Sequence, residues 1–352
     1  MVSLSSYSCM HLIVFSPSEL VFRVKLRICG DLRRVEGPCI FILNHRTRFD
    51  WMFFWSYVIR MGNPHKHRIV LKESLRKVPG FGETLPKSCT LTMLCHSSTF
   101  PPSSLPPPGW GMQACNFIFL KRKWTEDEKT LSDSLTYFTS RGYPLQLLFF
   151  PEGTDLSDSN REKSHQFSEK NGLPKFDYVL LPRTKGFAHC LRELRKGPSP
   201  PSVVNVSVGY VGRIPQNESD ILAGHWPREI HFCAETVPPS DVPLENGAVD
   251  DWLMERWQEK EEMLKRFYSD KRFSAQYLEE SSWQFVYWKM IGTLVFWALL
   301  LSAAFYCLFC CSLLWWLVLI NIFYLAVSHF GPGLDRVILY LHQMTYQARL
   351  FK

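Results

Sequence analysis

The stretch FILNHRTRFDW, residues 41–51, joins an unbroken apolar run to a polar loop. The run, Cys39–Leu43, shows no alternation of polar and apolar residues, which predicts a central strand buried on both faces. The loop carries His45 and Asp50, which on one regular helix would lie about 140° apart and could not bond easily. We therefore expect Asp50 to open the next helix and to accept a hydrogen bond from the imidazole of His45. A structural turn that contains a histidine is the alternative.

Further strands and helices alternate along the chain around this stretch. Residues 20–28 alternate polar and apolar side chains, which predicts a half-buried strand. A capping box of Thr125 and Glu128 predicts the start of a helix, and two more helices are expected over about 185–195 and 250–268. The other predicted strands span residues 117–120, 147–150, 203–210 and 229–233. This alternation predicts an α/β domain with a mainly parallel central sheet flanked by helices.

A second polar loop, FFPEGT at residues 149–154, follows another buried strand. Sites in such sheets lie in the loops at the carboxyl ends of the strands, so both loops are candidates for the site. The glycine and the small hydroxyl of FFPEGT could bind a phosphate or a hydroxyl-bearing headgroup.

Composition narrows the class of protein. The chain has 352 residues, with 40 lysines and arginines against 33 aspartates and glutamates, a net charge of +7. This balance fits an anionic membrane surface or a phosphate-rich ligand. It accompanies no zinc-finger or RNA-recognition pattern, so nucleic acid is not an expected partner. The 11 cysteines form no disulfide-like framework and are expected to be reduced thiols.

A block without any charged residue, 290–328, stands near the end of the chain. It is about twice the roughly 20 apolar residues that one membrane span requires, which predicts two transmembrane helices joined near residues 307–312. Lysines and arginines flank the block on both sides and are absent from its centre, which predicts that the large N-terminal domain faces the cytosol. One long helix buried in a soluble core is the alternative.

Residues 83–109 break the pattern of strands and helices. They are rich in proline, serine and threonine and have little periodicity, so we expect an exposed, disordered insertion. A proline-rich docking site is the alternative.

Together, NHRTRFD and the later FPEGT resemble the glycerophospholipid acyltransferase family. Two further blocks fall in the family's order: FIFLKRKW, which contains Arg122, and LPRTKGF, which leads to VVNVSVGY. The sequences of three segments look most similar to the lysocardiolipin acyltransferase branch: FPEGTD, EKNGLPKFDYVLLPRTKGF and WPREIHF. The resemblance implies an acyltransferase domain over 20–270, after an atypical segment 1–19. A linker 271–289, two transmembrane helices within 290–330 and a cytosolic tail 331–352 would follow.

The resemblance also implies a reaction and its residues. The enzyme would be an acyl-CoA-dependent O-acyltransferase of phospholipid synthesis or remodelling, in the endoplasmic reticulum membrane. His45 would take the proton of a lysophospholipid hydroxyl that attacks the thioester, and Asp50 would orient His45. No metal and no cofactor are expected, and acyl-CoA is a co-substrate. The expected acceptor-binding residues are Arg122, Glu152, Gly153, Thr154, Arg183 and Lys185.

Several interpretations stay open at the level of sequence. Arg46 and Arg48 would contact lipid phosphate or lie on the surface, and WMFFW, residues 51–55, would pack in the core or line an acyl pocket. Many family members carry a basic residue where Asp155 stands, which favours a headgroup other than lysophosphatidic acid. The candidate acceptors are lysocardiolipin, lysophosphatidylinositol, lysophosphatidylglycerol and lysophosphatidic acid. A catalytically impaired, membrane-anchored lipid-binding isoform is the rival to an active enzyme.

Overall fold

The computed structural model describes residues 19–31, 33–73, 117–279 and 284–310, with six single positions beyond them (315, 316, 319, 320, 340 and 342). The chain divides into two compact units. The first comprises residues 1–70 and 138–290, and the second comprises residues 71–137 and 291–352.

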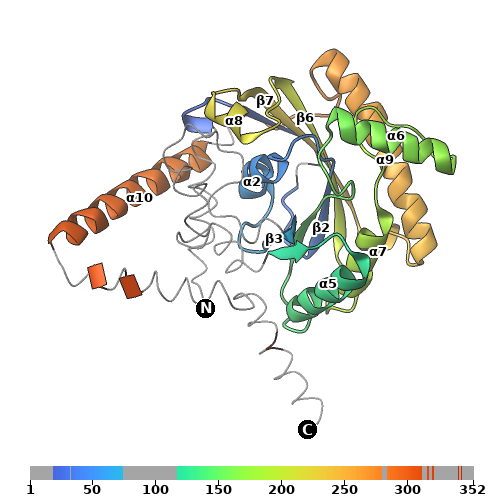
Figure 1. Ribbon diagram of the computed structural model, residues 1–352, viewed down its shortest axis with the longest axis horizontal. Coiled ribbons are helices and arrows are strands. Elements are labelled where there is room, and N and C mark those ends of the chain that lie inside the picture. Colours follow the sequence, from blue (N-terminus) through green and yellow to red (C-terminus); the bar gives the residue numbers. More distant parts are fainter. Residues whose placement is uncertain are drawn as a thin grey trace, which may run out of the picture. The chain divides into compact units, whose positions relative to one another are not determined.

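A twisted, mainly parallel sheet forms the centre of the first unit (Figure 1). In spatial order its strands are β1 (Lys25–Gly30), β7 (Pro227–Val237), β6 (Ser202–Gly212), β2 (Cys39–Leu43), β5 (Gln146–Phe149) and β3 (His67–Lys72). The pairs between these strands are parallel except β6 with β7, so the predicted sheet type is confirmed. β2 lies between β5 and β6, and every one of its residues is buried.

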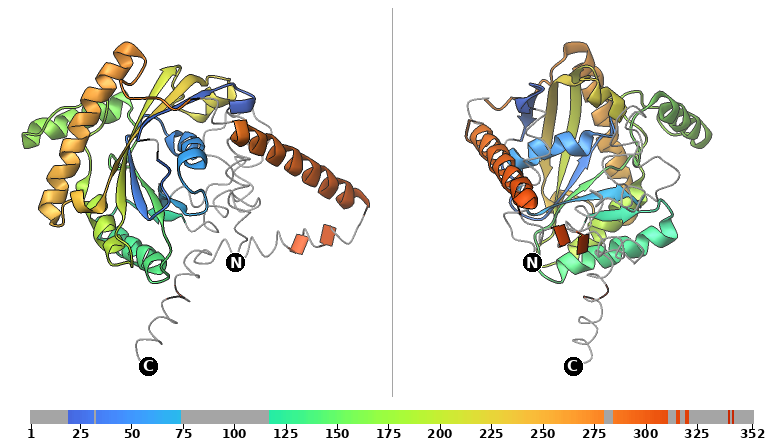
Figure 2. Two further views of the ribbon diagram at one scale, coloured as in Figure 1. Left: turned by 180° about the vertical axis from the view of Figure 1, so that it is seen from behind. Right: turned by 60° about the vertical axis from the view of Figure 1, so that its left-hand side comes forward.

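Helices cover both faces of this sheet. Successive residues of a strand point to opposite faces, and β6 shows which helix lies on each. Tyr210 contacts Phe53 of α2 (Asp50–Met61), at a ring distance of 6.0 Å. Its neighbour Gly209 lies against Phe267 of α9 (Asn246–Asp270) on the other face. Figure 2 shows α2 and α9 separated by the strands.

The aromatic block 51–55 belongs to the core of the α2 face. Met52, Phe53, Phe54 and Trp55 are buried, and the ring of Phe54 lies 5.2 Å from that of Phe41 in β2. Core packing therefore accounts for these side chains, as one of the two sequence interpretations proposed.

The remaining helices of the first unit follow the strands in sequence. The predicted helices near 185–195 and 250–268 are confirmed as α7 (Thr184–Arg195) and α9, and the rings of Phe187 and Trp252 stack between them at 6.1 Å. The other elements in the connections are α6 (Asp158–Asn171), α8 (Glu218–Leu222) and the 3-10 turn η2 (Pro239–Asp241).

The first strand begins later than its alternation predicts. The pattern starts at Leu20, but β1 begins at Lys25. Arg23 has a φ of 54°, a left-handed conformation that interrupts an extended chain. Phe22 stacks on Trp226 at a ring distance of 4.2 Å and so leaves the line of the strand.

The second unit holds β4 (Ile118–Leu120) and most of α5 (Trp124–Thr139). The predicted apolar stripe of α5 is confirmed, since Leu131 and Leu135 are fully buried. The predicted capping box is wrong, because α5 already begins at Trp124 and Thr125 lies inside it. The Asp127 carboxylate instead accepts a hydrogen bond of 2.7 Å from the Lys121 backbone N–H.

A long apolar helix, α10 (Gln284–Cys310), ends the described part of the chain. Its first 24 residues, Gln284–Cys307, are long and apolar enough to cross a membrane. The helix starts before the charge-free block and includes Lys289, so it begins inside the range expected as a linker. The second helix of the predicted hairpin falls mostly on 311–314, 317–318 and 321–330, most of the predicted tail falls on 331–339, 341 and 343–352, and the predicted insertion falls on 83–109; all of these lie outside the described residues.

We predict that Gly209→Ala destabilises the first unit. A β-carbon at Gly209 would lie 2.5 Å from Cε1 of Phe267, a fully buried ring that has no room to withdraw. Such overpacking costs about 1–3 kcal/mol. Gly37→Ala is the matched control, because its β-carbon would meet no atom within 4 Å. Urea unfolding of the purified chain in detergent checks the difference, and equal midpoints for the two variants would contradict it.

Candidate functional site

The two polar loops singled out from the sequence meet at one edge of the sheet. β2 runs parallel to both β5 and β6, so the carboxyl ends of these three strands lie together. The loops are joined directly: the Leu156 N–H donates to the His45 carbonyl at 2.7 Å, and the Arg46 side chain donates to the Leu156 carbonyl at 3.0 Å. Arg46 therefore braces the loops, whereas Arg48 lies exposed.

His45 and Asp50 form the expected hydrogen bond. Nδ1 of His45 lies 2.9 Å from Oδ2 of Asp50, which is the first residue of α2. The same oxygen accepts the Thr47 backbone N–H at 2.9 Å. Because the carboxylate is an acceptor, Nδ1 carries the proton and Nε2 is left with a lone pair. The imidazole is thus oriented as a general base is in catalytic triads.

Tyr210, which no sequence pattern assigned to the site, completes the environment of Asp50. Its hydroxyl donates a hydrogen bond to Oδ1 of Asp50. Burial and the charge of Asp50 raise the pKa of Tyr210 well above its ordinary value, so the hydroxyl keeps its proton. The Asp50 carboxylate is fully buried, and these donors stabilise its charge.

The electrostatic surroundings of His45 favour its protonated form. Burial of the ring lowers the pKa, but the hydrogen bond and charge of Asp50, with the charges of Glu152 and Asp155, raise it by more. The net pKa of His45 therefore lies above 6.5. The ring stacks on Phe150 at 4.3 Å, and 16% of the side chain stays exposed. The base is held firmly and can still be reached.

Glu152 lies beneath the site instead of opening onto it. The side chain is buried, with 2% of the residue exposed. Oε1 accepts the backbone N–H of His45 at 3.1 Å, and Oε2 accepts that of Leu180 at 3.1 Å. These bonds position the His45 loop, and the acceptor-binding role that the sequence predicts for Glu152 stays a prediction.

A buried cation from α9 accompanies Glu152. Lys260 is 1% exposed and donates from Nζ to the Val206 carbonyl at 2.5 Å. Trp257, one turn earlier, directs its indole N–H at Oε1 of Glu152 at 3.4 Å. Burial raises the pKa of Glu152 to about 7, against the charge of His45 and the hydrogen bonds that Glu152 accepts. Burial lowers the pKa of Lys260 to about 7, against the charge of Glu152. Helix α9 thus supports the loop that carries His45.

The remaining expected residues of the second loop lie near the start of α7. Gly153 has a φ of 71°, and a β-carbon there would lie 3.6 Å from Cδ of Arg183. Arg183 precedes the first residue of α7 and makes no side-chain cap, and Lys185 lies exposed in the first turn. The hydroxyl of Thr154 accepts the Asn160 side-chain amide at 3.2 Å. Basic side chains and a helix N-terminus are therefore available for an anion.

A second carboxylate of α9 fixes the chain that leads to α7. Glu261 accepts three backbone N–H groups, from Asp177 and Tyr178 at 2.8 Å and from Val179 at 3.1 Å. These bonds hold the segment that precedes Arg183. The expected arginine of the second unit, Arg122, has a φ of 65° after β4, and its role stays a prediction. Among the described residues, no group of three His, Cys, Asp or Glu side chains could hold a metal ion.

Three side chains of the site were not predicted from the sequence. Tyr210, Trp257 and Lys260 come from β6 and α9, distant in sequence from His45. A signal for Tyr210 existed, since it stands near the end of a predicted strand. A lysine and a tryptophan on a polar helix carry no such signal. The rival interpretation of an impaired isoform gains no support from the described residues, because His45 and Asp50 are intact and bonded.

The shifted pKa values of Glu152 and Lys260 predict how the unfolding free energy depends on pH. Between pH 4.5 and about 7 the folded state retains a proton on Glu152 that the unfolded state has released, so the unfolding free energy falls as the pH rises. Between about 7 and 10.5 the unfolded state holds a proton that Lys260 has lost, so the contribution of Lys260 to the unfolding free energy rises with pH. Glu152→Gln should weaken the falling limb and Lys260→Met the rising limb, while His45 and Cys39, whose pKa values are also raised, contribute in both variants. Denaturant unfolding across this pH range checks both, and unchanged limbs in the variants would refute the assignment.

Comparison with known proteins agrees with this geometry. The Acyltransferase family profile matches residues 24–99 and 101–210, and the Acyltransferase C-terminus profile matches residues 220–297. Lysocardiolipin acyltransferase 1 of Mus musculus is 36% identical over 324 residues, 90% of this chain and 79% of that protein. The protein of the same name from Danio rerio is 40% identical over 259 residues, 73% of this chain and 60% of its own length.

More distant relatives extend the comparison. Lysophosphatidylinositol acyltransferase 10 of Caenorhabditis elegans is 33% identical over 305 residues, 83% of this chain and 71% of that protein. The crystal structure of the 1-acyl-sn-glycerophosphate acyltransferase of Thermotoga maritima aligns with a TM-score of 0.43 and 15% identity, over 78% of this chain and 86% of that one. The family profiles and the identities above 30% establish that the chain belongs to the glycerophospholipid acyltransferase family, in its lysocardiolipin acyltransferase branch.

Proposed function

We propose that the chain transfers a fatty acyl group from acyl-CoA to a hydroxyl of a lysophospholipid at a membrane. The observation that carries the proposal is the 2.9 Å bond between His45 Nδ1 and the buried carboxylate of Asp50. It leaves Nε2 unprotonated and oriented by a fixed negative charge. A base of this kind suits removal of a proton from a hydroxyl at neutral pH.

The reaction follows from that arrangement. Nε2 of His45 takes the proton of the acceptor hydroxyl while its oxygen attacks the thioester carbonyl carbon. Asp50 stabilises the imidazolium that forms, and Tyr210 and Thr47 stabilise Asp50 through their hydrogen bonds. The carbon–sulfur bond then breaks, and the coenzyme A thiolate receives the proton from the imidazolium. The acyl group arrives activated as a thioester, so the scheme uses no covalent enzyme intermediate and no metal.

The acceptor would bind through its phosphate at the second loop. Arg183 lies against Gly153, Lys185 follows in the first turn of α7, and the helix N-terminus adds partial positive charge. Arg122 is proposed for the same headgroup from the family pattern alone. The names of the relatives point to lysocardiolipin and lysophosphatidylinositol as the first acceptors to test, with lysophosphatidylglycerol and lysophosphatidic acid beside them.

We further propose that the protein is a multi-pass protein of the endoplasmic reticulum membrane, with its first unit in the cytosol. The support is α10, whose length and composition suit a span, together with the basic residues on both sides of the apolar block. Release of the free coenzyme A thiol from acyl-CoA, measured with each of the four lysophospholipids, tests the activity and its acceptor together. Thiol release at the uncatalysed rate with every acceptor would refute the proposed function.

We predict that His45→Ala lowers kcat by about 10³-fold, since general bases contribute about 10²–10⁴-fold. Asp50→Asn should lower it less, because the base remains but loses its orientation. His165→Gln is a matched control: this histidine lies 2.8 Å from the Phe176 carbonyl, and glutamine can keep that bond. Thiol release under saturating acyl-CoA checks all three variants. Near-normal turnover by His45→Ala would end the mechanism.

The rate should also depend on pH through His45. Only the neutral imidazole accepts a proton, so kcat/KM should rise with pH and reach half its maximum above pH 6.5, the ordinary value that this pKa exceeds. Asp50→Asn removes the hydrogen bond and charge that raise the pKa, so the midpoint should move to lower pH. A pH profile of kcat/KM for both proteins measures the shift. An identical midpoint would show that Asp50 does not set this pKa.

A further inference from the structure

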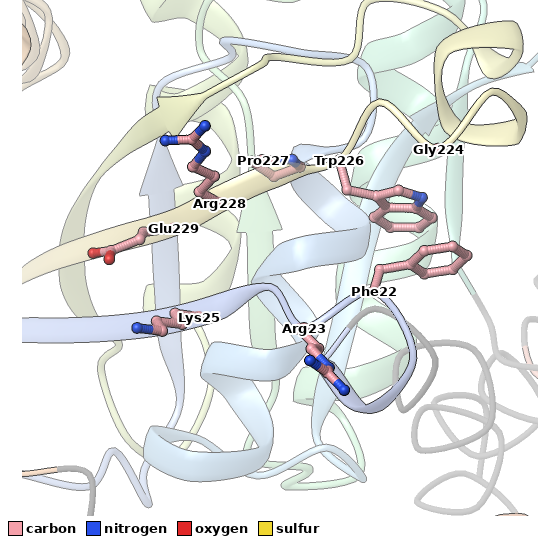
Figure 3. A pocket seen from close by; sticks show the side chains of 8 residues that line it. All are labelled: Phe22, Arg23, Lys25, Gly224, Trp226, Pro227, Arg228 and Glu229. Carbon is pink, nitrogen blue, oxygen red and sulfur yellow. The ribbon is translucent and has the colours of Figure 1, made fainter.

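An exposed patch of aromatic and basic side chains lies where β1 and β7 begin. We name it the edge patch and define it as Phe22, Arg23, Lys25, Trp226 and Arg228. Phe22 is 43% exposed, and its ring stacks on that of Trp226 with an angle of 13° between the planes. Figure 3 shows the two rings face to face, with Arg23 and Arg228 extending away from them. Two further exposed apolar side chains, Val21 and Leu222, stand close in sequence to the patch.

The charge of the edge patch is positive. Its three basic side chains border a surface hollow of about 390 Å³. Glu229 also borders it, but this carboxylate already contacts Arg27 at 3.7 Å and His231 at 3.1 Å. None of the three basic residues pairs with an acidic side chain in the part of the chain that the structure describes. The hollow therefore offers uncompensated positive charge beside stacked aromatic rings.

The strand directions place the edge patch at the same edge of the sheet as His45. β6 is parallel to β2, and β7 is antiparallel to β6, so β7 begins where β6 ends, on the same side of the sheet as the end of β2 but farther along, since Pro227 pairs with Gly212 and Leu43 with Val206. β1 is parallel to β7 and begins there too. A side-chain contact confirms the proximity, since the ring of Trp226 lies 6.2 Å from Phe53, in the first turn of α2 after Asp50.

A chain of contacts within the first unit connects this edge with the beginning of α10. Glu19, three residues before Phe22, pairs with Arg60 of α2 at 2.7 Å. The Arg60 guanidinium in turn lies 5.7 Å from the ring centre of Tyr287, in the first turn of α10. The helix suited to crossing a membrane thus begins near the residues that lead into the patch.

We propose that the edge patch docks on the surface of an anionic phospholipid bilayer, with the aromatic rings at the interface and the basic groups on lipid phosphates. Aromatic rings favour the membrane interface, and basic residues close to an anionic surface gain about 1 kcal/mol each, which is about fivefold in the docking equilibrium. Docking here would turn the edge that carries His45 toward the lipid. The inference rests on the proposed function, which places the substrate in a membrane.

Photo-crosslinking in reconstituted vesicles tests the docking. The full chain is reconstituted into phosphatidylcholine vesicles with or without phosphatidylserine, both containing a trace of phosphatidylcholine with a photoreactive headgroup. We expect mass spectrometry to find lipid adducts on the peptides that hold residues 21–25 and 222–228. The adducts should increase with phosphatidylserine and decrease at high salt, since salt screens exposed charges. Adducts confined to α10, or equal in both vesicles and at both salt concentrations, would overturn the proposal.

Paired variants show whether the charges are responsible. Arg23→Asn with Arg228→Gln removes two charges, and asparagine tolerates the left-handed backbone at position 23. Adducts on the patch peptides should fall about fivefold or more in vesicles with phosphatidylserine. The matched control is Lys163→Gln with Phe167→Ala on α6, where Phe167 is 54% exposed, and it should leave these adducts unchanged. Equal yields from both double variants would refute the proposal.

Thiol release separates failure of the docking from failure of the proposed function. With a short-chain lysophospholipid below its micelle concentration, the acceptor is monomeric and docking is not required. The Arg23→Asn, Arg228→Gln variant should then match the unchanged chain, while with long-chain acceptor in vesicles it should be slower. Equal rates in vesicles would count against docking and leave the proposed function standing. No turnover of either acceptor by the unchanged chain would refute the function alone.

Discussion

The buried carboxylate of Glu152 is the constraint on which the site depends. Burying the ionised form of a carboxyl group costs several kcal/mol unless hydrogen bonds stabilise it, and this cost raises the pKa of Glu152 to about 7. The cost is comparable to the whole unfolding free energy of a small domain. The donors to Glu152 come from three places: the His45 loop, the chain before α7, and Trp257 of α9. Each of these segments must be in place for the charge to be tolerated. The requirement ties the loop after β2 to the C-terminal half of the unit.

The two buried carboxylates of the site perform different tasks because their donors differ. Asp50 is bonded through side-chain and backbone groups that face His45, so its charge acts on the imidazole. Glu152 receives the backbone N–H of the same residue, so it holds the position of the chain, and its charge also raises the pKa of His45. Asp50 orients the imidazole directly, whereas Glu152 acts on it through the backbone and through its charge. The exposed basic groups of Arg183 and Lys185 remain for a ligand.

The sequence predicted the features that arise from local patterns. Apolar runs identified β2 and β5, and the rule that sites follow the carboxyl ends of parallel strands was enough to predict that His45 and the FFPEGT loop belong to one site. Pairing between distant segments was not predictable: the antiparallel match of β6 with β7, the hydroxyl of Tyr210 on Asp50, and Lys260 under the sheet. Local rules also failed where tertiary contacts prevailed. Because Phe22 stacks on Trp226, β1 begins later in the sequence than its alternation predicts. The carboxylate of Glu152 is buried and accepts backbone N–H groups, although its motif suggested a contact with the ligand.

The position of α9 in the chain has a consequence for the order of biosynthesis. Domains form from the N-terminus as the polypeptide leaves the ribosome, and contacts between distant residues form slowly. Here the first strand has as its partner β7, one of the last, and Glu152 must await Trp257. His45 is therefore synthesised early but reaches its final position late. The apolar strand β2 is likewise synthesised before β5, β6 and α9, with which it is later buried. α9 is closely followed in the chain by the apolar α10, so the last contacts of the His45 site form as the helix long and apolar enough to cross a membrane is synthesised.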